Sequence, residues 1–205
     1  RKRFWLIDRQ GLVFDDQPDL HASQAKFARS SSERPLYDQY DLPAVVKGVR
    51  PSVLIGSSAV SGAFTNEVLT DIAALVSRPV ILPLSNPTSR AEATPQRIFE
   101  ATAGQAFVAT GSPFASFEYC GEKIMTGQCN NAYAFPGIGL GVVAVKAERI
   151  TQRMLLAASE AISECAVRND YSEHLITPIP EMAVMVAKEV AFAVASVAIQ
   201  DGLSD

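Results

Sequence analysis

Uncharged amide side chains stand at two points where an apolar run gives way to a polar turn. Asn130 and Asn131 precede a glycine-rich run at 135–141, and Asn86 follows the apolar run 79–84. Amides offer hydrogen-bond donors and acceptors without charge, so they can hold a carboxylate, a hydroxyl or a cofactor amide in a fixed orientation. They do not perform acid–base chemistry. The pattern therefore predicts a ligand-binding site.

Apolar runs of strand length alternate with helical patterns along the chain. We predict strands at Phe4–Ile7, Val53–Ile55, Val80–Leu84 and Ala106–Ala109, each followed by a polar or glycine-containing turn. This alternation is typical of a parallel α/β sheet, which binds its ligands at the carboxyl ends of the strands. The polar turns after these strands are therefore the expected site.

Helix starts are legible from threonines that precede periodic apolar segments. We predict helices after Thr65, Thr94 and Thr151, a short helix at 23–28 and a final helix at 181–200. Gly104 is expected to close the helix that follows Thr94. The region 168–180, which contains two prolines, is predicted to be a loop.

Composition excludes several classes of function. The net charge is −4 and no run of Lys or Arg is present, so nothing in the charge pattern indicates nucleic acid as a partner. Cys120, Cys129 and Cys165 are widely spaced, which favours neither a disulfide framework nor a zinc site and suits a cytoplasmic protein. The apolar segment 183–199 carries Lys188 and Glu189 near its middle, so we expect a buried helix rather than a membrane span.

Few residues could carry out catalysis. Asp8 ends the first predicted strand, where a dinucleotide-binding sheet places the acid that binds the ribose, although an Asp there is more often a turn former. The spacing of Gly137, Gly139 and Gly141 does not match the dinucleotide fingerprint and favours close helix packing. His21 and His174 lie in polar segments, where a surface role is expected, and no acidic cluster predicts a metal site.

These motifs together resemble the malic enzymes over nearly the whole chain. The segments that carry the resemblance are 5–12, 54–56, 62–65, 83–94, 109–114 and 128–141. The resemblance implies a Rossmann-like parallel α/β sheet that lacks its first strand and glycine fingerprint, followed by C-terminal helices. Residues 1–148 would form the partial dinucleotide-binding domain, and residues 149–205 would form helices that pack on it.

Malic enzymes oxidise malate with NAD(P) and decarboxylate the product to pyruvate, using a divalent metal as Lewis acid. The resemblance implies a small-molecule partner, malate, in a cytoplasmic homo-oligomer. The implied cofactor-binding residues are Asp8, Gln24, Gly56, Ser57, Ser58 and Asn86, and the implied substrate-binding residues are Asn86, Asn130 and Asn131. The catalytic acid and base and the ligands of Mg²⁺ or Mn²⁺ would lie upstream of Arg1, so the chain is expected to be an inactive fragment.

Cofactor choice and product leave alternatives open. NADP-linked members tend to carry a lysine where Gln24 stands, so a neutral Gln24 beside Asp8 favours NAD, although Lys26 and Arg29 could supply the missing charge. Malolactic enzymes, which release lactate, also resemble the segments 8–12 and 14–16, whereas 112–114 and 128–131 resemble the oxidative decarboxylases more and favour malic enzyme. A non-catalytic module that binds a nucleotide or mediates assembly is the alternative from another class.

Overall fold

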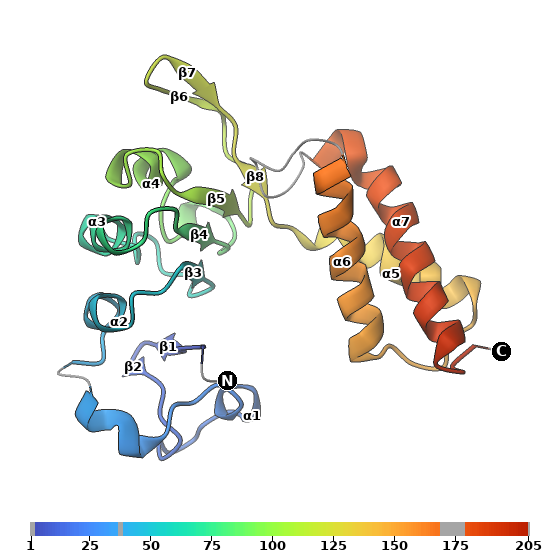
Figure 1. Cartoon of the computed structure of the whole chain (residues 1–205), viewed down its shortest axis with the longest axis horizontal. Coiled ribbons are helices and arrows are strands. Elements are labelled where there is room, and N and C mark those ends of the chain that lie inside the picture. The colour runs from blue at the N-terminus through green and yellow to red at the C-terminus, as the bar shows by residue number, and fades with distance from the viewer. Residues whose placement is uncertain (1–2, 37–38, 169–178, 205) are drawn as a thin grey trace.

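The computed structural model describes residues 3–36, 39–168 and 179–204, with the backbone alone for 179–182. Figure 1 shows a sheet-bearing part followed by a helical part at its carboxyl-end side. The predicted loop at 168–180 and His174 fall almost wholly outside the described residues. The fold class is α/β with a parallel sheet, as the sequence predicts.

A four-stranded parallel sheet forms the centre of the first part. Its order is β3 (Val53–Gly56), β4 (Val80–Pro83), β5 (Phe107–Thr110) and β8 (Gly127–Gln128). Val53 pairs with Val80 and Val80 with Phe107, so neighbouring strands end close together. Their carboxyl ends face the helical part (Figure 1). This alignment gathers the turns that carry the predicted site residues.

Three helices cover one face of this sheet. They are α2 (Leu42–Val49), α3 (Asn66–Leu75) and α4 (Pro95–Ala101). One buried cluster joins the helices to the strands through Val46, Ile72, Ile98, Leu54, Ile81 and Val108 among others. On β3 burial alternates, and Val53 and Ile55 remain 45% and 57% exposed. One face of the outer strand is therefore packed and the other is open.

The threonine helix starts are confirmed. Thr65 and Thr94 each accept a hydrogen bond from the backbone N–H three residues later, at 3.3 Å. Thr151 does the same for Met154 at the start of α6 (Gln152–Arg168). These side chains satisfy N–H groups that have no partner in the first helical turn. Gly104 follows α4 with a positive φ of 72°, and its N–H donates to the Phe99 carbonyl oxygen at 2.8 Å, a hydrogen bond typical of a helix end.

The prediction that Phe4–Ile7 joins the parallel sheet is wrong. The short strand β1 (Ile7–Asp8) pairs antiparallel with β2 (Gly11–Leu12) in a separate two-stranded sheet. In a doubly wound sheet the strand that ends in the ribose acid lies beside the strand that precedes it in the chain. Here β1 pairs instead with β2, the strand that follows it in the chain.

The rest of the N-terminal segment folds around a small third cluster. Leu12, Phe14 and Val45 are its buried members, and α1 (Ala22–Ala25) and the 3-10 helix η1 (Ser31–Leu36) lie in the same segment. The short helix predicted at 23–28 therefore exists but starts and ends earlier. His21 caps α1 and is exposed, which agrees with the surface role expected of it.

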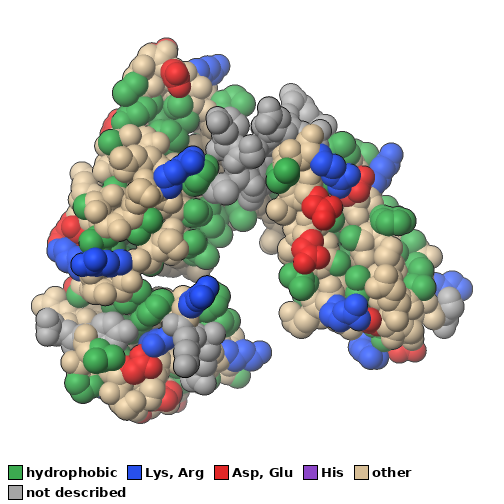
Figure 2. Space-filling view, viewed as in Figure 1, with side chains coloured by type: hydrophobic (Ala, Val, Ile, Leu, Met, Phe, Trp, Pro, Cys, Tyr) green, Lys and Arg blue, Asp and Glu red, His purple; other side chains and the backbone are tan. Residues whose placement is uncertain are grey.

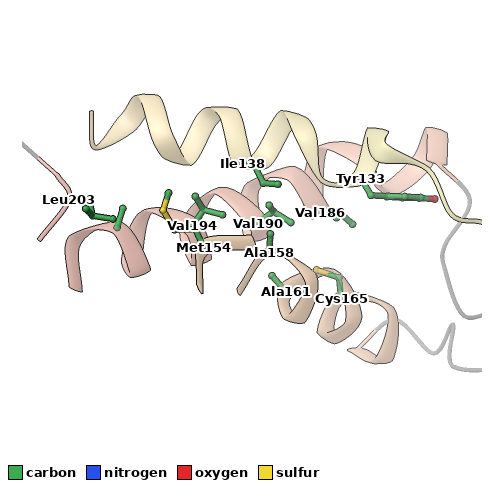
Figure 3. Packing of buried hydrophobic residues seen from close by; sticks show 11 residues of the cluster. Tyr133, Ile138, Met154, Ala158, Ala161, Cys165, Val186, Val190, Val194 and Leu203 are labelled. Carbon is green, nitrogen blue, oxygen red and sulfur yellow. The ribbon is translucent and has the colours of Figure 1, made fainter. Parts of the chain in front are cut away.

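The helical part has a core of its own. It is built from η3 (Asn131–Tyr133), α5 (Phe135–Ala144), α6 and α7 (Ile179–Gln200). Figure 3 shows Val190 and Val194 of α7 directed toward Ile138, Met154 and Ala158. The buried cluster of this part shares no residue with that of the sheet. Helix α5 precedes residue 148 yet contributes Ile138 to this cluster. The domain boundary expected after residue 148 stays a prediction.

The last helix is buried on one face only. Val186, Val190, Val194 and Ala198 have at most 1% exposure, whereas Phe192 is 75% exposed. By length and composition alone Ala183–Gln200 could cross a membrane, and 28% of that window is buried in this structure. Core helices of other proteins share these properties. The expectation of a buried helix holds for one face of α7, while the other face is exposed.

Candidate functional site

A pocket of about 440 Å³ opens at the carboxyl ends of the strands, between the sheet and the helical part. Asn86, Asn130 and Asn131 all line it, together with Leu84, Gly111, Cys129, Tyr133, Ala134 and Ile162. The three predicted substrate residues therefore come together although 44 positions of sequence separate Asn86 from Asn130. The lining combines amide side chains with apolar ones, and Ile162 of α6 supplies part of the apolar surface.

Asn86 is placed by the turn after β4. Its Oδ1 accepts a hydrogen bond from the Ser112 hydroxyl in the turn after β5. The two turns approach so closely that a Cβ on Gly111 would lie 2.1 Å from the Leu84 carbonyl oxygen. Only glycine fits there. Gly111 therefore sets the spacing between the turn that carries Asn86 and its neighbour.

Asn130 and Asn131 lie where β8 passes into η3. The Asn130 amide donates to the Gly111 carbonyl at 3.3 Å, and its Oδ1 accepts from the Ala132 N–H at 2.9 Å. Asn130 is thus held in one orientation as the cap of η3. Asn131 is exposed and its side chain makes no hydrogen bond within the described part of the chain. Its amide is free to bind a ligand.

Gly56, Ser57 and Ser58 follow β3, one strand away from the turn that carries Asn86. Gly56 is buried and both serines are exposed. A Cβ on Gly56 would lie 2.5 Å from the Glu92 carboxyl carbon, so no side chain fits at this position. These three residues do not line the pocket but stand beside it on the same edge of the sheet.

Glu92 is a buried charged residue that the sequence reasoning did not single out. It is fully buried and accepts hydrogen bonds from Ser58 and Ser85, which follow two different strands. Burial pushes the pKa of Glu92 upward, but the hydrogen bonds from Ser85 and Ser58 outweigh it and lower the pKa overall. Glu92 is therefore a buried carboxylate anion. Its serine partners lie 7 and 34 positions away, so no local pattern announces the cluster.

Asp8 and Gln24 lie together but outside the pocket lining. The Gln24 amide reaches Asp8 Oδ2 at 3.5 Å, and Asp8 Oδ1 accepts the Gln10 N–H at 2.8 Å. Asp8 is exposed. Arg29, one of the cations considered as a phosphate partner, pairs with Glu33 at 2.5 Å and stacks over Trp5. Lys26 is exposed nearby in sequence.

Tyr133 combines burial with an orphan hydroxyl. The residue is 3% exposed, and its hydroxyl has no hydrogen-bond partner among the described residues. Burial raises the pKa of Tyr133 to about 12 and also raises the pKa of the Cys129 thiol. Both groups are therefore uncharged near neutral pH. Among the described residues the lining of the pocket contains no Asp, Glu, His, Lys or Arg, so it offers hydrogen bonds and apolar surface rather than acid–base groups.

No divalent metal site forms within the described residues, where no three His, Cys, Asp or Glu side chains gather. The donors at the pocket are neutral amides, which Mg²⁺ and Mn²⁺ bind together with carboxylates and water rather than alone. The described part of this chain therefore does not fit the metal. That the metal ligands lie elsewhere stays a prediction.

Comparison with known proteins identifies relatives along the whole chain. Residues 1–199 match the family model described as "Malic enzyme, NAD binding domain". The chain is 43% identical to the NAD-dependent malic enzyme of Acinetobacter baylyi and 42% identical to that of Shewanella frigidimarina, with 100% of this chain covered in both cases. It spans 37% of the length of each of these relatives.

A solved structure has the same fold. The crystal structure of Entamoeba histolytica malic enzyme superposes with a TM-score of 0.72 and 24% identity, covering 96% of this chain and 37% of that one. At this identity the likeness concerns the fold alone. It confirms the Rossmann-like α/β class expected from the sequence, including the helices that follow the sheet.

Proposed function

This chain belongs to the malic enzyme family, in which it forms the NAD-binding domain, and from this premise we propose that its residues line the cofactor and substrate site for the NAD-linked oxidation and decarboxylation of malate to pyruvate. The observation that carries the proposal is the convergence of Asn86, Asn130 and Asn131 on one pocket. Uncharged amides suit the malate carboxylates and hydroxyl and the nicotinamide amide. The names of the relatives support NAD as the cofactor.

The pocket has the chemistry to orient both ligands. Asn131 offers an unpaired amide, and Asn130 and Asn86 are fixed by contacts with Gly111 and Ser112. Leu84 and Ile162 add apolar surface that suits the flat nicotinamide ring. Asp8, with Gln24 beside it, would bind the ribose hydroxyls of the adenosine. NAD, when bound in this way, would supply the hydride acceptor.

The catalytic groups would come from the rest of the full-length gene product, because the described residues that line the pocket include no acid or base. These 205 residues alone should therefore bind weakly at most and turn over no malate. A cytoplasmic homo-oligomer remains part of the proposal. The malolactic reaction and a purely assembling module are kept as outcomes of the test.

The test uses the full-length gene product that contains these residues. With malate, NAD and Mn²⁺ it should produce NADH, which absorbance detects, and pyruvate, which chromatography identifies. Asn131→Ala should raise the KM for malate by about tenfold, the effect of losing one or two good hydrogen bonds to a charged group. Asn66→Ala, an exposed asparagine on α3, should leave the KM unchanged.

The products separate the alternatives. Lactate in place of pyruvate would assign the protein to the malolactic reaction. Absence of any malate-dependent chemistry, together with no NADH binding, would leave only the assembling module. An unchanged KM in Asn131→Ala would show that malate does not reach this pocket.

A further inference from the structure

A buried carboxylate ties together two turns at the edge of the sheet where the proposed function places the cofactor. Glu92 Oε1 accepts the Ser58 N–H at 2.8 Å, the Ser58 hydroxyl at 2.8 Å and the Ser85 hydroxyl at 2.5 Å. Oε2 lies 3.4 Å from the Ser85 N–H. We call this group of Glu92, Ser58 and Ser85 the Glu92 clasp.

The two hydroxyls in the Glu92 clasp must donate to the carboxylate. The Ser85 oxygen already accepts the Ala59 N–H at 2.8 Å, and the Ser58 oxygen accepts the Val60 N–H at 3.2 Å. Each hydroxyl proton is therefore directed at Glu92. An acceptor that receives three donors at one oxygen suits a carboxylate, and the lowered pKa of Glu92 agrees with an anion.

The backbone around Glu92 reinforces the same connection. Its carbonyl oxygen accepts the Phe64 N–H at 3.1 Å, and the Ala91 carbonyl accepts the Gly62 N–H at 3.3 Å. The segment 91–92 thus holds both ends of the loop 57–64. The carboxyl group also fills the space in which a Gly56 side chain would stand. Glu92 fixes the turn after β3 against the turn after β4.

We propose that Glu92 is a positioning residue, which holds the Ser57–Ser58 turn and the Asn86 turn in the arrangement that binds the dinucleotide. Ser85 precedes Asn86 directly, so the Glu92 clasp anchors the backbone from which the Asn86 side chain extends. Glu92 itself is fully buried, so it would act through the two turns rather than by contact with the dinucleotide. Without the clasp, ordering these turns becomes a cost of binding, and affinity falls.

The inference rests on the proposed function, because it needs a dinucleotide at these turns. The test is a fluorescence titration of NADH into the full-length gene product, carried out well below the thermal midpoint of each variant. Glu92→Leu removes every acceptor at similar volume and should weaken NADH binding by about tenfold or more. Ser85→Ala breaks the link on the β4 side alone and should weaken binding in the same direction.

Glu92→Gln is the conservative variant. Its amide oxygen can take the place of Oε1 and keep three hydrogen bonds, while its NH₂ faces the more distant Ser85 N–H. Binding should therefore recover most of the way toward the wild type. Glu100→Gln removes an exposed carboxylate on α4 and should bind NADH like the wild type.

Amide hydrogen exchange supplies the readout that a general loss of stability would not give. Glu92→Leu should speed exchange at 58–60 and 85–86 while exchange at 80–82 in β4 stays unchanged. A stable Glu92→Leu protein that binds NADH like the wild type overturns the inference alone. Failure of the wild type to bind NADH overturns the inference together with the proposed function.

Discussion

Gln24 and Asp8 form the side-chain pair on which cofactor choice depends in the proposed function. Gln24 reaches Asp8 at 3.5 Å, so the site presents a carboxylate and a neutral amide where an additional phosphate would have to lie. Like charge disfavours NADP there, and Arg29 is already paired with Glu33. The residues therefore agree with NAD.

Gln24→Lys should shift the preference toward NADP. An ammonium group at this position can pair with the 2′-phosphate, and one exposed ion pair is modest, so the ratio of kcat/KM for NADP to that for NAD should rise by about three- to tenfold. Gln152→Lys, an exposed glutamine at the start of α6, controls for added charge. An unchanged ratio would place the ribose away from Asp8.

The buried hydroxyl of Tyr133 should have a measurable effect on stability. A buried hydroxyl without a partner carries a desolvation cost in the folded state, and Tyr133→Phe removes it without leaving a cavity. The variant should unfold at the same denaturant midpoint as the wild type or at a higher one. A clear loss of stability in urea titration would mean that the hydroxyl has a bonded partner.

Glu92 makes the stability of the sheet part depend on acidity. Its folded pKa lies below the ordinary value of a glutamate, so the hydrogen-bonded anion contributes stability that is complete above about pH 4.3 and is lost as the pH falls through the folded pKa. The difference in unfolding free energy between the wild type and Glu92→Leu should therefore shrink on acidification below that value. Urea titrations across the acid range measure it.

At the scale of elements, α5 and α7 meet through glycines. A Cβ on Gly141 would lie 2.6 Å from the Ala191 carbonyl oxygen, and one on Gly137 would lie 2.5 Å from the Val190 side chain. Gly139, on another face of α5, has nothing within 4 Å. The expectation that this run serves close helix packing is confirmed at two of its three glycines.

Two alanine substitutions separate packing from helix propensity. Gly141→Ala should destabilise the protein by about 1–3 kcal/mol because backbone cannot yield to the added methyl group. Gly139→Ala should stabilise it by about 0.5–1 kcal/mol because alanine costs less to order in a helix. Thermal or urea unfolding measures both changes in the free energy of unfolding. Equal effects of the two changes would contradict the close approach of α5 to α7.

The extent to which sequence predicts this structure varies by element. Thr65, Thr94 and Thr151 are local signals with a local cause, and the helices begin where they predict. The strand β8 has only two residues, and β6 (Phe117–Tyr119) and β7 (Glu122–Ile124) have three each, so none of them is long enough to show a clear strand periodicity. The helix α2 had a readable start in Asp41, which caps it, and was not predicted.

The candidate site could be predicted in part, where local sequence signals mark its residues. Asn86 follows a recognisable strand, so its place at the edge of the sheet follows from the parallel topology, whereas Asn130 and Asn131 follow the two-residue strand β8 and were recognised from their turn. Glu92 depends on partners brought together by the tertiary fold, and its charge suggests an exposed residue. Family resemblance supplied the roles that neither pattern nor spacing could assign.

At the scale of the whole molecule, the sheet has an open outer strand. β3 ends the strand order, and its Val53 and Ile55 side chains remain exposed. Figure 2 shows further hydrophobic side chains on the surface of both parts. Open edges and apolar surface favour pairing with another chain.

The isolated 205-residue polypeptide should therefore associate at micromolar concentrations in sedimentation velocity. Ile55→Lys places a charge on the open face of β3 and should shift the distribution toward monomer. Lys substituted for the exposed Val167 at the end of α6 is the matched control. A monomer at every concentration tested would show that the outer strand is protected in solution.

The pocket has walls that belong to two separately packed cores. Leu84, Asn86 and Gly111 extend from the sheet, whereas Tyr133 and Ile162 belong to the helical part, and an opening separates the two parts in Figure 2. A ligand bound there would contact both parts and so couple their unfolding. In calorimetry, the ligand-free protein should show two melting transitions. Added ligand should merge them into one, and the melting temperature of the less stable part should rise most.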